Sequence, residues 1–570
     1  MPCRCPETHE PAREGREGAV DTMRTVDVIA RILKREGVRY LSAFPTSTLI
    51  EAAAAVDIRP VICRQERVGV GIADGYSRVN NGTPPGVFAM QFGPGAENAY
   101  AGVATAFSDA VPMLLLPLGH TRERDGVFPQ FSSLRNYAAV TKFVEQVTTA
   151  DRVVDTMRRA FARLKMGRPG PVMVEIPADV AGEELDAAVV ERYRPVKAAV
   201  SQADPRDVTA AAKALLEARD PVILAGQGVL YAEAAPELLE LAELTRVPVV
   251  TTMGGKSAFP ESHPLALGSA SGVMNLPVYH FLKQADVVLA AGTSLTRHPM
   301  TTPIPADRTF IQVTDDPIDV GKNYDVEYPV IGDARLVLRQ FVEAARDLLN
   351  GRSREDRSPA RAIAELRAAW LEAWDEKLTS DEVPINPYRV IAEFMKAVDP
   401  AEAIVTHDSG SPRDQIMPFY RSAGPRSYLG WGKSHGLGTG LGLNLGAKLA
   451  APDKFVVNFM GDAAFGMTGL DFETAVRSEL PILTIVLNNS TMAVETRHMT
   501  VSHERYGSRD LGGNYADMAR AMGGWAERVE DPAEVGPAIV RARRATEEGR
   551  AALLEFITGA EIEYSHKGAF

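Results

Sequence analysis

The chain contains 570 residues, of which 45% are hydrophobic and 24% are charged, a composition normal for a globular protein with several domains. Its net charge of −12 argues against a nucleic-acid partner, because phosphate binding needs a basic surface, and its apolar runs fall short of the ~18 residues that a membrane helix needs. Three cysteines are too few for a disulfide framework, which predicts a reduced, cytoplasmic setting.

The first part of the chain contains a polar leader and then a block of alternating patterns. Residues 1–23 are mixed in charge and lack the apolar stretch of a secretory signal, so we expect a disordered extension. From 24 to 180, helical periodicity alternates with short apolar runs such as VFAMQF (87–92), VPMLLLPLG (111–119) and GPVMVEIP (170–177). This alternation predicts a parallel sheet covered by helices on both faces.

The same alternation returns twice. A charged stretch at 181–206 is predicted to be a linker, and 207–349 again shows apolar runs that end in Gly, Thr, Ser or Asp. A second charged connection, 350–383, leads to a third block at 384–570. The predicted fold is therefore α/β, with three doubly wound parallel-sheet domains.

Two apolar runs of the third block end abruptly in polar residues. Strand 455–460 leads to Asp462, and strand 482–488 leads to Asn489. Because the carboxyl ends of parallel strands lie side by side, we expect both side chains at one rim, with the amino terminus of helix 468–479 beside them. Carboxylate and amide oxygens suit Mg²⁺, and N–H groups at a helix start suit a phosphate. The pattern predicts a Mg²⁺-diphosphate site; the alternative is that both dipeptides only form turns.

This part of the sequence resembles a known motif. Gly461-Asp462-Ala463, followed by 24 residues and Asn488-Asn489, is similar to the diphosphate-binding motif of thiamine diphosphate-dependent enzymes, which is Gly-Asp-Gly, a spacer and Asn-Asn. RQERVGVGIADGYSRVNNG (64–82) and FGPGAENAYAGVATAFSDAVPMLLLPLG (92–119) resemble first-domain motifs of the same family. The chain is therefore identified as a member of that family, with its closest general likeness to the acetolactate synthase-like branch.

The resemblance implies cofactors and roles for individual residues. Thiamine diphosphate and Mg²⁺ are the implied cofactors, and 24–180, 207–349 and 384–570 are the implied pyrimidine-binding, central and diphosphate-binding domains. The implied metal ligands are Asp462, Asn489 and the backbone oxygen of Thr491. Glu66, in the first turn of a helix, is the implied catalytic glutamate that hydrogen-bonds the aminopyrimidine ring, which in turn removes the thiazolium proton. The other implied cofactor contacts are Ser409, Gly410, Ser411, His435, Leu437, Gly461, Ala463, Ala464 and Val494.

The glycine-rich stretch 430–446 resembles the family segment that clasps the aminopyrimidine ring. Leu437 falls at the apolar wedge beneath the two rings, where acetolactate synthases usually carry Met; the alternative for this residue is ordinary packing. His435 stands where the family often has Gly, and its backbone carbonyl is expected to accept a hydrogen bond from the ring amino group.

Substrate contacts rest on fewer positions. Gln130 lies near the family's Phe-Gln active-site segment, and His120, His435 and His498 are candidate polar groups around the carbonyl or a departing carboxylate, although a lone histidine can equally be structural. The chain departs from acetolactate synthases at 43–46, where it has Ala-Phe-Pro-Thr, and at His498, where many relatives have Trp. Both departures argue against a standard acetolactate synthase.

The leading hypothesis is an enzyme that decarboxylates a 2-oxo acid, with or without carboligation. A lyase or hydrolase acting on a 2-hydroxy ketone, a diketone or a 2-hydroxyacyl thioester is the alternative within the cofactor class, and an NAD-type Rossmann oxidoreductase is the alternative outside it. The resemblance implies a homodimer or homotetramer with active sites between chains. FAD in the central domain is the less favoured expectation, because PVILAGQG (221–228) lacks a full GxGxxG fingerprint.

Overall fold

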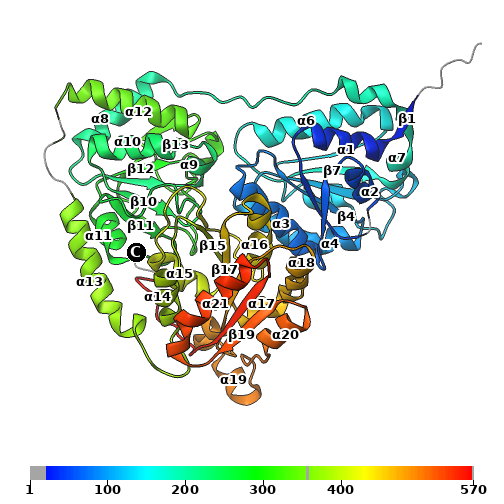
Figure 1. Cartoon of the computed structure of the whole chain (residues 1–570). Coiled ribbons are helices and arrows are strands. Elements are labelled where there is room, and N and C mark those ends of the chain that lie inside the picture. Colours follow the sequence, from blue (N-terminus) through cyan, green and yellow to red (C-terminus); the bar gives the residue numbers. More distant parts are fainter. Residues whose placement is uncertain (1–20, 46, 353, 355–358, 568–570) are drawn as a thin grey trace, which may run out of the picture.

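The structure is a computed structural model that describes residues 21–45, 47–352, 354 and 359–567. It contains three six-stranded sheets, and the strands within each sheet run parallel. Figure 1 shows the first domain in blue and cyan, the central domain in green and the third domain in yellow to red. The predicted fold class is confirmed. Most of the predicted disordered extension, residues 1–20, and Thr46 of the departure at 43–46 lie outside the described residues.

The first and third sheets share one topology. In both, the second strand along the chain lies at one edge beside the first, and the last two strands exchange places at the other edge. The first sheet has the order β3 (Arg59–Ile62), β2 (Tyr40–Ala43), β4 (Gly86–Met90), β5 (Met113–Gly119), β7 (Val172–Pro177), β6 (Phe143–Gln146). The third has the order β16 (Tyr428–Leu429), β15 (Ala403–His407), β17 (Phe455–Gly461), β18 (Leu483–Asn488), β20 (Ala552–Ile557), β19 (Trp525–Val529).

The central sheet differs. Its order is β11 (Ala266–Ala270), β10 (Val249–Thr252), β9 (Val222–Ala225), β12 (Val287–Ala291), β13 (Thr309–Thr314), β14 (Tyr328–Ile331). This is the 3-2-1-4-5-6 arrangement of nucleotide-binding sheets, in which the strand order reverses between the first and fourth strands. The corresponding crevice lies at the carboxyl ends of β9 and β12.

Helices cover both faces of the sheets, whose strands are buried apolar runs as expected for parallel sheets. Those of the first domain are α1 (Thr25–Arg35), α2 (Thr48–Ala54), α3 (Glu66–Val79), α4 (Pro94–Ser108), α5 (Ser133–Tyr137), α6 (Val153–Lys165) and α7 (Ala178–Gly182). Those of the central domain are α8 (Pro205–Glu217), α9 (Gln227–Tyr231), α10 (Ala235–Thr245), α11 (Leu276–Gln284) and α12 (Ala334–Leu349), followed by the connecting helix α13 (Ala360–Leu378). Those of the third domain are α14 (Pro387–Ala397), α15 (Ser411–Phe419), α16 (Gly440–Ala450), α17 (Asp462–Thr468), α18 (Phe472–Arg477), α19 (Thr500–Tyr506), α20 (Tyr515–Ala521) and α21 (Val535–Glu547). Among the described residues, no helix is long and apolar enough to cross a membrane.

Several predicted boundaries differ from the structure. Residues 22 and 23, placed in the disordered extension, belong to β1 (Thr22–Arg24), which pairs antiparallel with β8 (Glu184–Asp186). The start of the predicted linker 181–206 therefore belongs to the first domain, because its backbone groups are satisfied there. Further along, the linker 350–383 contains α13, whose Trp370 and Trp374 are buried. The free cysteine Cys63 is buried in the first domain.

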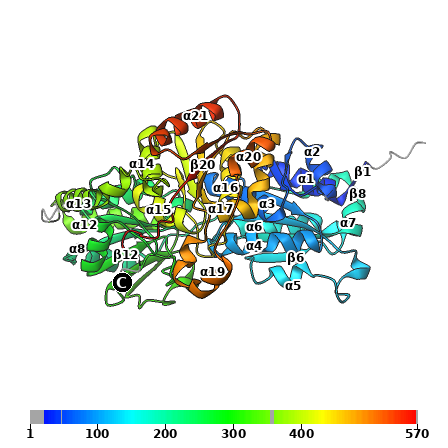
Figure 2. The same cartoon turned by 90° about the horizontal axis from the view of Figure 1, so that it is seen from below.

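The first and third domains meet through α3 and α16, which lie side by side in Figures 1 and 2. The two helices cross at glycines. A Cβ atom at Gly75 would lie 2.2 Å from the backbone oxygen of Leu443, and one at Gly446 would lie 2.1 Å from the backbone oxygen of Ile72. The backbones approach so closely that these positions have no room for a side chain.

We therefore expect Gly75→Ala to push α3 and α16 apart and to lower the free energy of unfolding by about 1–3 kcal/mol or more, since the atom it meets is backbone. Calorimetric thermal midpoints would measure the loss. Gly182→Ala is the matched control, because nothing lies within 4 Å of a Cβ atom there. Equal midpoints for the two variants would contradict the close-packed interface.

Candidate functional site

The rim predicted around Asp462 is formed by the ends of two neighbouring strands. Strands β17 and β18 pair in parallel with Gly461 opposite Leu487, so Asp462 and Asn488 are the next residues on each side. The predicted helix 468–479 is wrong in its bounds: α17 begins at Asp462, directly after β17, whereas 468–479 contains a short 3-10 turn and α18. In the first turn of α17, the carboxylate of Asp462 accepts a hydrogen bond from the backbone N–H of Ala463 at 2.8 Å, which satisfies one of the N–H groups at the helix start.

Asp462 carries an unsatisfied oxygen. Its side chain is buried, and Oδ1 accepts a hydrogen bond from the backbone N–H of Ala463 at 2.8 Å. Oδ2 is buried and has no hydrogen-bond partner among the described residues. Burial raises the pKa of Asp462 to about 6. A buried carboxylate oxygen without a partner is costly, and a divalent cation would compensate it, so the residue fits a Mg²⁺ ligand.

The remaining predicted metal ligands follow β18, the strand that pairs with the one before Asp462. Ser490, whose N–H donates to Asn488 Oδ1 at 3.0 Å, stands between Asn489 and Thr491. Asn489 is half-buried, and its Oδ1 accepts from the N–H of Thr491 at 3.1 Å. Within the described ranges, no group of three or more His, Cys, Asp or Glu side chains could hold a metal. A metal at this rim would therefore depend on amide and backbone oxygens beside one carboxylate.

The loop after β15 reaches the rim from the neighbouring strand. Gly410 has a φ of 93°, a left-handed conformation that favours glycine, and it caps α15. Ser409 is buried. The hydroxyl of Ser411 already forms a 2.7 Å hydrogen bond with the hydroxyl of Tyr564, in the C-terminal segment. Ser411 can therefore offer its backbone N–H to a diphosphate more readily than its hydroxyl.

The glycine loop, which we define as residues 430–440, connects β16 to α16. Leu437 is half-buried and packs against the core shared by α3, α4 and the third sheet. His435 is exposed, has a φ of 40° and places its ring 6.0 Å from that of His298 in the central domain. Glycine adopts this left-handed backbone conformation most easily, which explains why the family often has glycine where this chain has His435.

Glu66 lies in the first domain and begins α3, as predicted. It is buried, and its Oε2 accepts a hydrogen bond from Asn98 Nδ2 at 3.3 Å. Its Oε1 lies 3.5 Å from the Cβ position of Gly95, in the Gly-Pro-Gly turn that starts α4. The buried carboxylate and this turn form a second half-site at the carboxyl end of the first sheet.

Two predicted substrate residues follow β5 in the same domain. The ring of His120 packs against Phe92 with centroids 4.8 Å apart, and its Nε2 is buried. Gln130 is half-buried and its Oε1 is also buried. Neither atom has a hydrogen-bond partner in the part of the chain that the structure describes, so both are available to a polar ligand. By contrast, Val494 and His498 are exposed.

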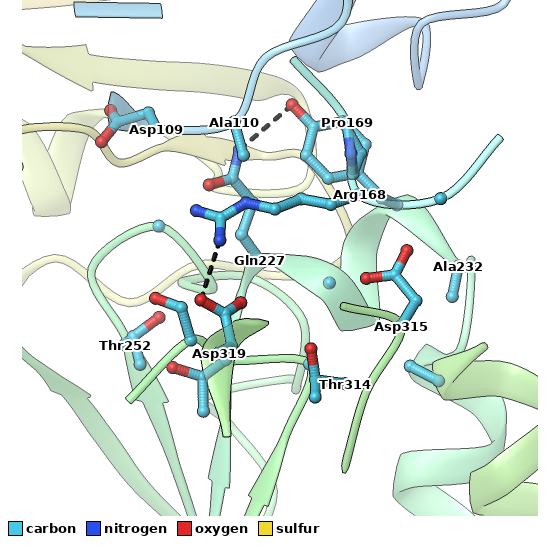
Figure 3. A pocket seen from close by; sticks show the side chains of 18 of the residues that line it. Asp109, Ala110, Arg168, Pro169, Gln227, Ala232, Thr252, Thr314, Asp315 and Asp319 are labelled. Carbon is cyan, nitrogen blue, oxygen red and sulfur yellow. Dashed lines mark hydrogen bonds and ion pairs between the residues drawn. The ribbon is translucent and has the colours of Figure 1, made fainter. Parts of the chain in front are cut away.

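A cavity of about 590 Å³ lies away from this rim, at the junction of the three domains. Figure 3 shows Gln227, at the start of α9, with Thr252 and Thr314, at the ends of β10 and β13, around the same cavity as Arg168, whose guanidinium donates to Asp319 at 2.8 Å. The cavity lies at the carboxyl ends of β9 and β12, where nucleotides bind in sheets of this order. Its lining includes neither Glu66 nor Asp462.

Three residues near the site were missed by the sequence analysis. Asn98 contacts Glu66, Asp408 binds the backbone of the glycine loop, and Asp109 binds the same loop from the first domain. Only Asp408 left a signal, as a carboxylate directly after the apolar run AIVTH (403–407).

Comparison with known proteins gives three consecutive family matches. Residues 23–140 match the family described as "Thiamine pyrophosphate enzyme, N-terminal TPP binding domain". Residues 208–341 match "Thiamine pyrophosphate enzyme, central domain", and residues 408–556 match "Thiamine pyrophosphate enzyme, C-terminal TPP binding domain". The chain is 30% identical to the acetolactate synthase large subunit of Corynebacterium glutamicum, over 97% of this chain and 89% of that protein.

Two further relatives match at similar levels. A probable acetolactate synthase large subunit of Methanococcus aeolicus is 29% identical over 91% of this chain and 90% of its own length. A sulfoacetaldehyde acetyltransferase of Alcaligenes xylosoxydans xylosoxydans is 28% identical over 91% of this chain and 90% of its own length. The matches span all three sheets.

Proposed function

The chain belongs to the thiamine pyrophosphate enzyme family, in its acetolactate synthase-like branch, and from that premise we propose a Mg²⁺-dependent reaction at a carbon–carbon bond next to a carbonyl. The simplest form is decarboxylation of a 2-oxo acid, with or without ligation to a second carbonyl compound. Bound thiamine diphosphate supplies the electron sink for such bonds.

The observation that carries this proposal is the unpartnered buried oxygen of Asp462. In our proposal Asp462 Oδ2, Asn489 and the backbone oxygen of Thr491 bind Mg²⁺. Backbone N–H groups at the starts of α15 and α17, and those beside Gly410, then face the diphosphate. The small side chains of Ala463 and Ala464 allow the backbone to approach it.

Glu66 is proposed to hold and return a proton at the aminopyrimidine ring. Its burial and its contact with Asn98 orient the carboxyl group at the start of α3. Leu437 is proposed to support the cofactor rings from below. His120 and Gln130 are proposed to bind the substrate carbonyl or carboxylate, since each presents a buried polar atom without a partner among the described residues.

The alternative within this cofactor class is a lyase or hydrolase acting on a 2-hydroxy ketone, a diketone or a 2-hydroxyacyl thioester. Departures from acetolactate synthases at 43–45 and His498, together with the sulfoacetaldehyde acetyltransferase relative, support a substrate other than the usual one. The family matches favour the thiamine class over an NAD-type oxidoreductase.

We also propose a homodimer or homotetramer with active sites between chains. Large apolar side chains are exposed on the elements that carry the half-sites: Phe107 on α4, Phe128 near Gln130, and Met467 on α17. Burial of these side chains against a second copy would remove apolar surface from water. The central cavity is the proposed position for a nucleotide such as FAD or ADP if the protein carries one.

A substrate panel tests the proposed reaction. The protein loaded with thiamine diphosphate and Mg²⁺ would be incubated with 2-oxo acids, with and without aldehyde acceptors, and with sulfoacetaldehyde. Carbon dioxide release and new carbon–carbon products separate a decarboxylase from a carboligase, and cleavage of 2-hydroxy ketones identifies a lyase. Turnover that does not depend on thiamine diphosphate for any substrate would contradict the proposal.

A further inference from the structure

Each end of the glycine loop is held by a buried carboxylate. Five of its eleven residues, 430–440, are glycines, so the free loop has many backbone conformations to lose. The two carboxylates come from different domains: Asp408 follows β15 in the third domain, and Asp109 follows α4 in the first.

Asp408 holds the end that leads into α16. It is fully buried, its Oδ1 accepts from the N–H of Gly438 at 2.8 Å, and its Oδ2 accepts from the N–H of Gly440 at 2.8 Å. Oδ1 also accepts from its neighbour Ser409 at 2.7 Å. Three backbone donors therefore converge on one side chain and tie the loop to the segment that carries Gly410.

Asp109 holds the other end. Its Oδ2 accepts from the N–H of Gly432 at 3.2 Å, and its Oδ1 accepts from the N–H of Lys433 at 3.3 Å. Arg78 of α3 orients this carboxylate by donating to Oδ2 at 3.1 Å, and it also donates to the backbone oxygen of Gly430 at 3.1 Å. Both side chains are buried, which strengthens these bonds relative to exposed ones, and Asp109 also borders the central cavity.

The segment between the two anchors contains the residues expected at the cofactor. Residues 434–437 carry His435 and Leu437, and a Cβ atom at Gly436 would lie 3.1 Å from Thr105 Oγ1 of α4. The first domain therefore limits this segment sterically as well as through Asp109. Because the loop is already ordered in the folded protein, a ligand does not have to pay the conformational entropy of ordering it when it binds.

We propose that Asp109 and Asp408 are positioning residues that hold both ends of the glycine loop and so fix residues 434–437 in the conformation that receives the aminopyrimidine ring. This inference rests on the proposed function. Under this proposal the first domain has two roles. Asp109 shapes the glycine loop of its own chain, whereas Glu66 is expected to contribute to an active site whose other half comes from a second chain.

Calorimetric titration tests this with two ligands, thiamine diphosphate and inorganic pyrophosphate, each with Mg²⁺. Asp109→Asn and Asp408→Asn replace an acceptor with an amide, and we expect thiamine diphosphate to bind at least about tenfold more weakly. Pyrophosphate is expected to contact the rim at Asp462 and Asn489 and the N–H groups beside Gly410, none of which Asp109 touches, so its affinity for Asp109→Asn should stay within about twofold of the wild type. Asp408 also binds the N–H of Ser409, so its variant is judged on thiamine diphosphate alone. Equal weakening of both ligands in Asp109→Asn, or unchanged thiamine diphosphate affinity in either variant, would overturn the proposal.

Glu36→Gln is the matched control. Glu36 is a buried carboxylate of the first domain that binds Lys165 and accepts from the backbone N–H of Val196 at 3.1 Å, away from the loop. Both affinities should be unchanged in this variant. Wild-type protein that binds pyrophosphate but not thiamine diphosphate would overturn the proposed function, and this inference with it.

A measurement on the wild-type protein covers the case in which a variant does not fold. In hydrogen–deuterium exchange without ligand, the amides of Gly432, Lys433, Gly438 and Gly440 should exchange slowly, because each donates to a buried carboxylate. Residues 434–437 should gain protection with thiamine diphosphate and not with pyrophosphate. Fast exchange at the four anchored amides would contradict the proposal.

Discussion

Replacing Glu66 with glutamine is expected to leave thiamine diphosphate bound and to slow exchange of its thiazolium proton by at least about tenfold. Glutamine keeps the shape of the side chain and can keep the contact with Asn98, so the half-site should stay folded. It cannot hold and return a proton at the ring, which is the step assigned to the Glu66 carboxyl. Quenched-flow NMR of deuterium exchange at the thiazolium carbon measures this exchange rate directly.

The control for that experiment is Glu97→Gln. Glu97 lies on α4 beside Asn98, but it is exposed, so its replacement removes the same charge without touching the half-site. Its exchange rate should match the wild type. An unchanged rate in Glu66→Gln would mean that Glu66 is misassigned.

Mixing two inactive variants is expected to restore activity if the sites lie between chains. In a heterodimer of Glu66→Gln and Asp462→Ala, one site contains both substitutions and the other contains neither. Random reassortment then gives about a quarter of wild-type activity from two preparations that are each nearly inactive. Activity measured before and after dissociation and reassembly tests this.

The control places both substitutions in one chain and mixes it with the wild type. Every heterodimer site then lacks either Glu66 or Asp462, so activity should fall toward about a quarter rather than a half. A site completed within one chain predicts the opposite pattern: no recovery in the first mixture and half of the activity in the second. That result would contradict the proposed arrangement between chains.

Much of the fold could be predicted from the sequence, because parallel strands leave strong local patterns. The runs before Asp408 and Asp462 are continuous, apolar and closed by polar residues, and each became a buried strand. The bounds of short elements were harder. Helix 468–479 was misplaced because Gly466 and Gly469 weaken the local helical pattern, and α17 begins without a side-chain cap that the sequence could signal.

The candidate site was predictable where it follows strand ends and hidden where it depends on distant contacts. Asp462, Asn489 and Glu66 stand at the starts or ends of regular elements, and their surroundings follow from topology. Asp109 ends an ordinary helix, and only the packing of α3 against α16 brings it to Gly432, 323 residues later. Sequence periodicity carries no information about such a contact.

The central claim is that the Asp462 rim binds a divalent cation together with the diphosphate of the cofactor. Calorimetric titration of the apoprotein with thiamine diphosphate, in Mg²⁺ and in a chelator, tests it most directly. We predict binding in Mg²⁺ that is lost in the chelator and weakened at least about a hundredfold by Asp462→Ala. Equal affinity with and without the metal, or an affinity unaffected by Asp462→Ala, would contradict it.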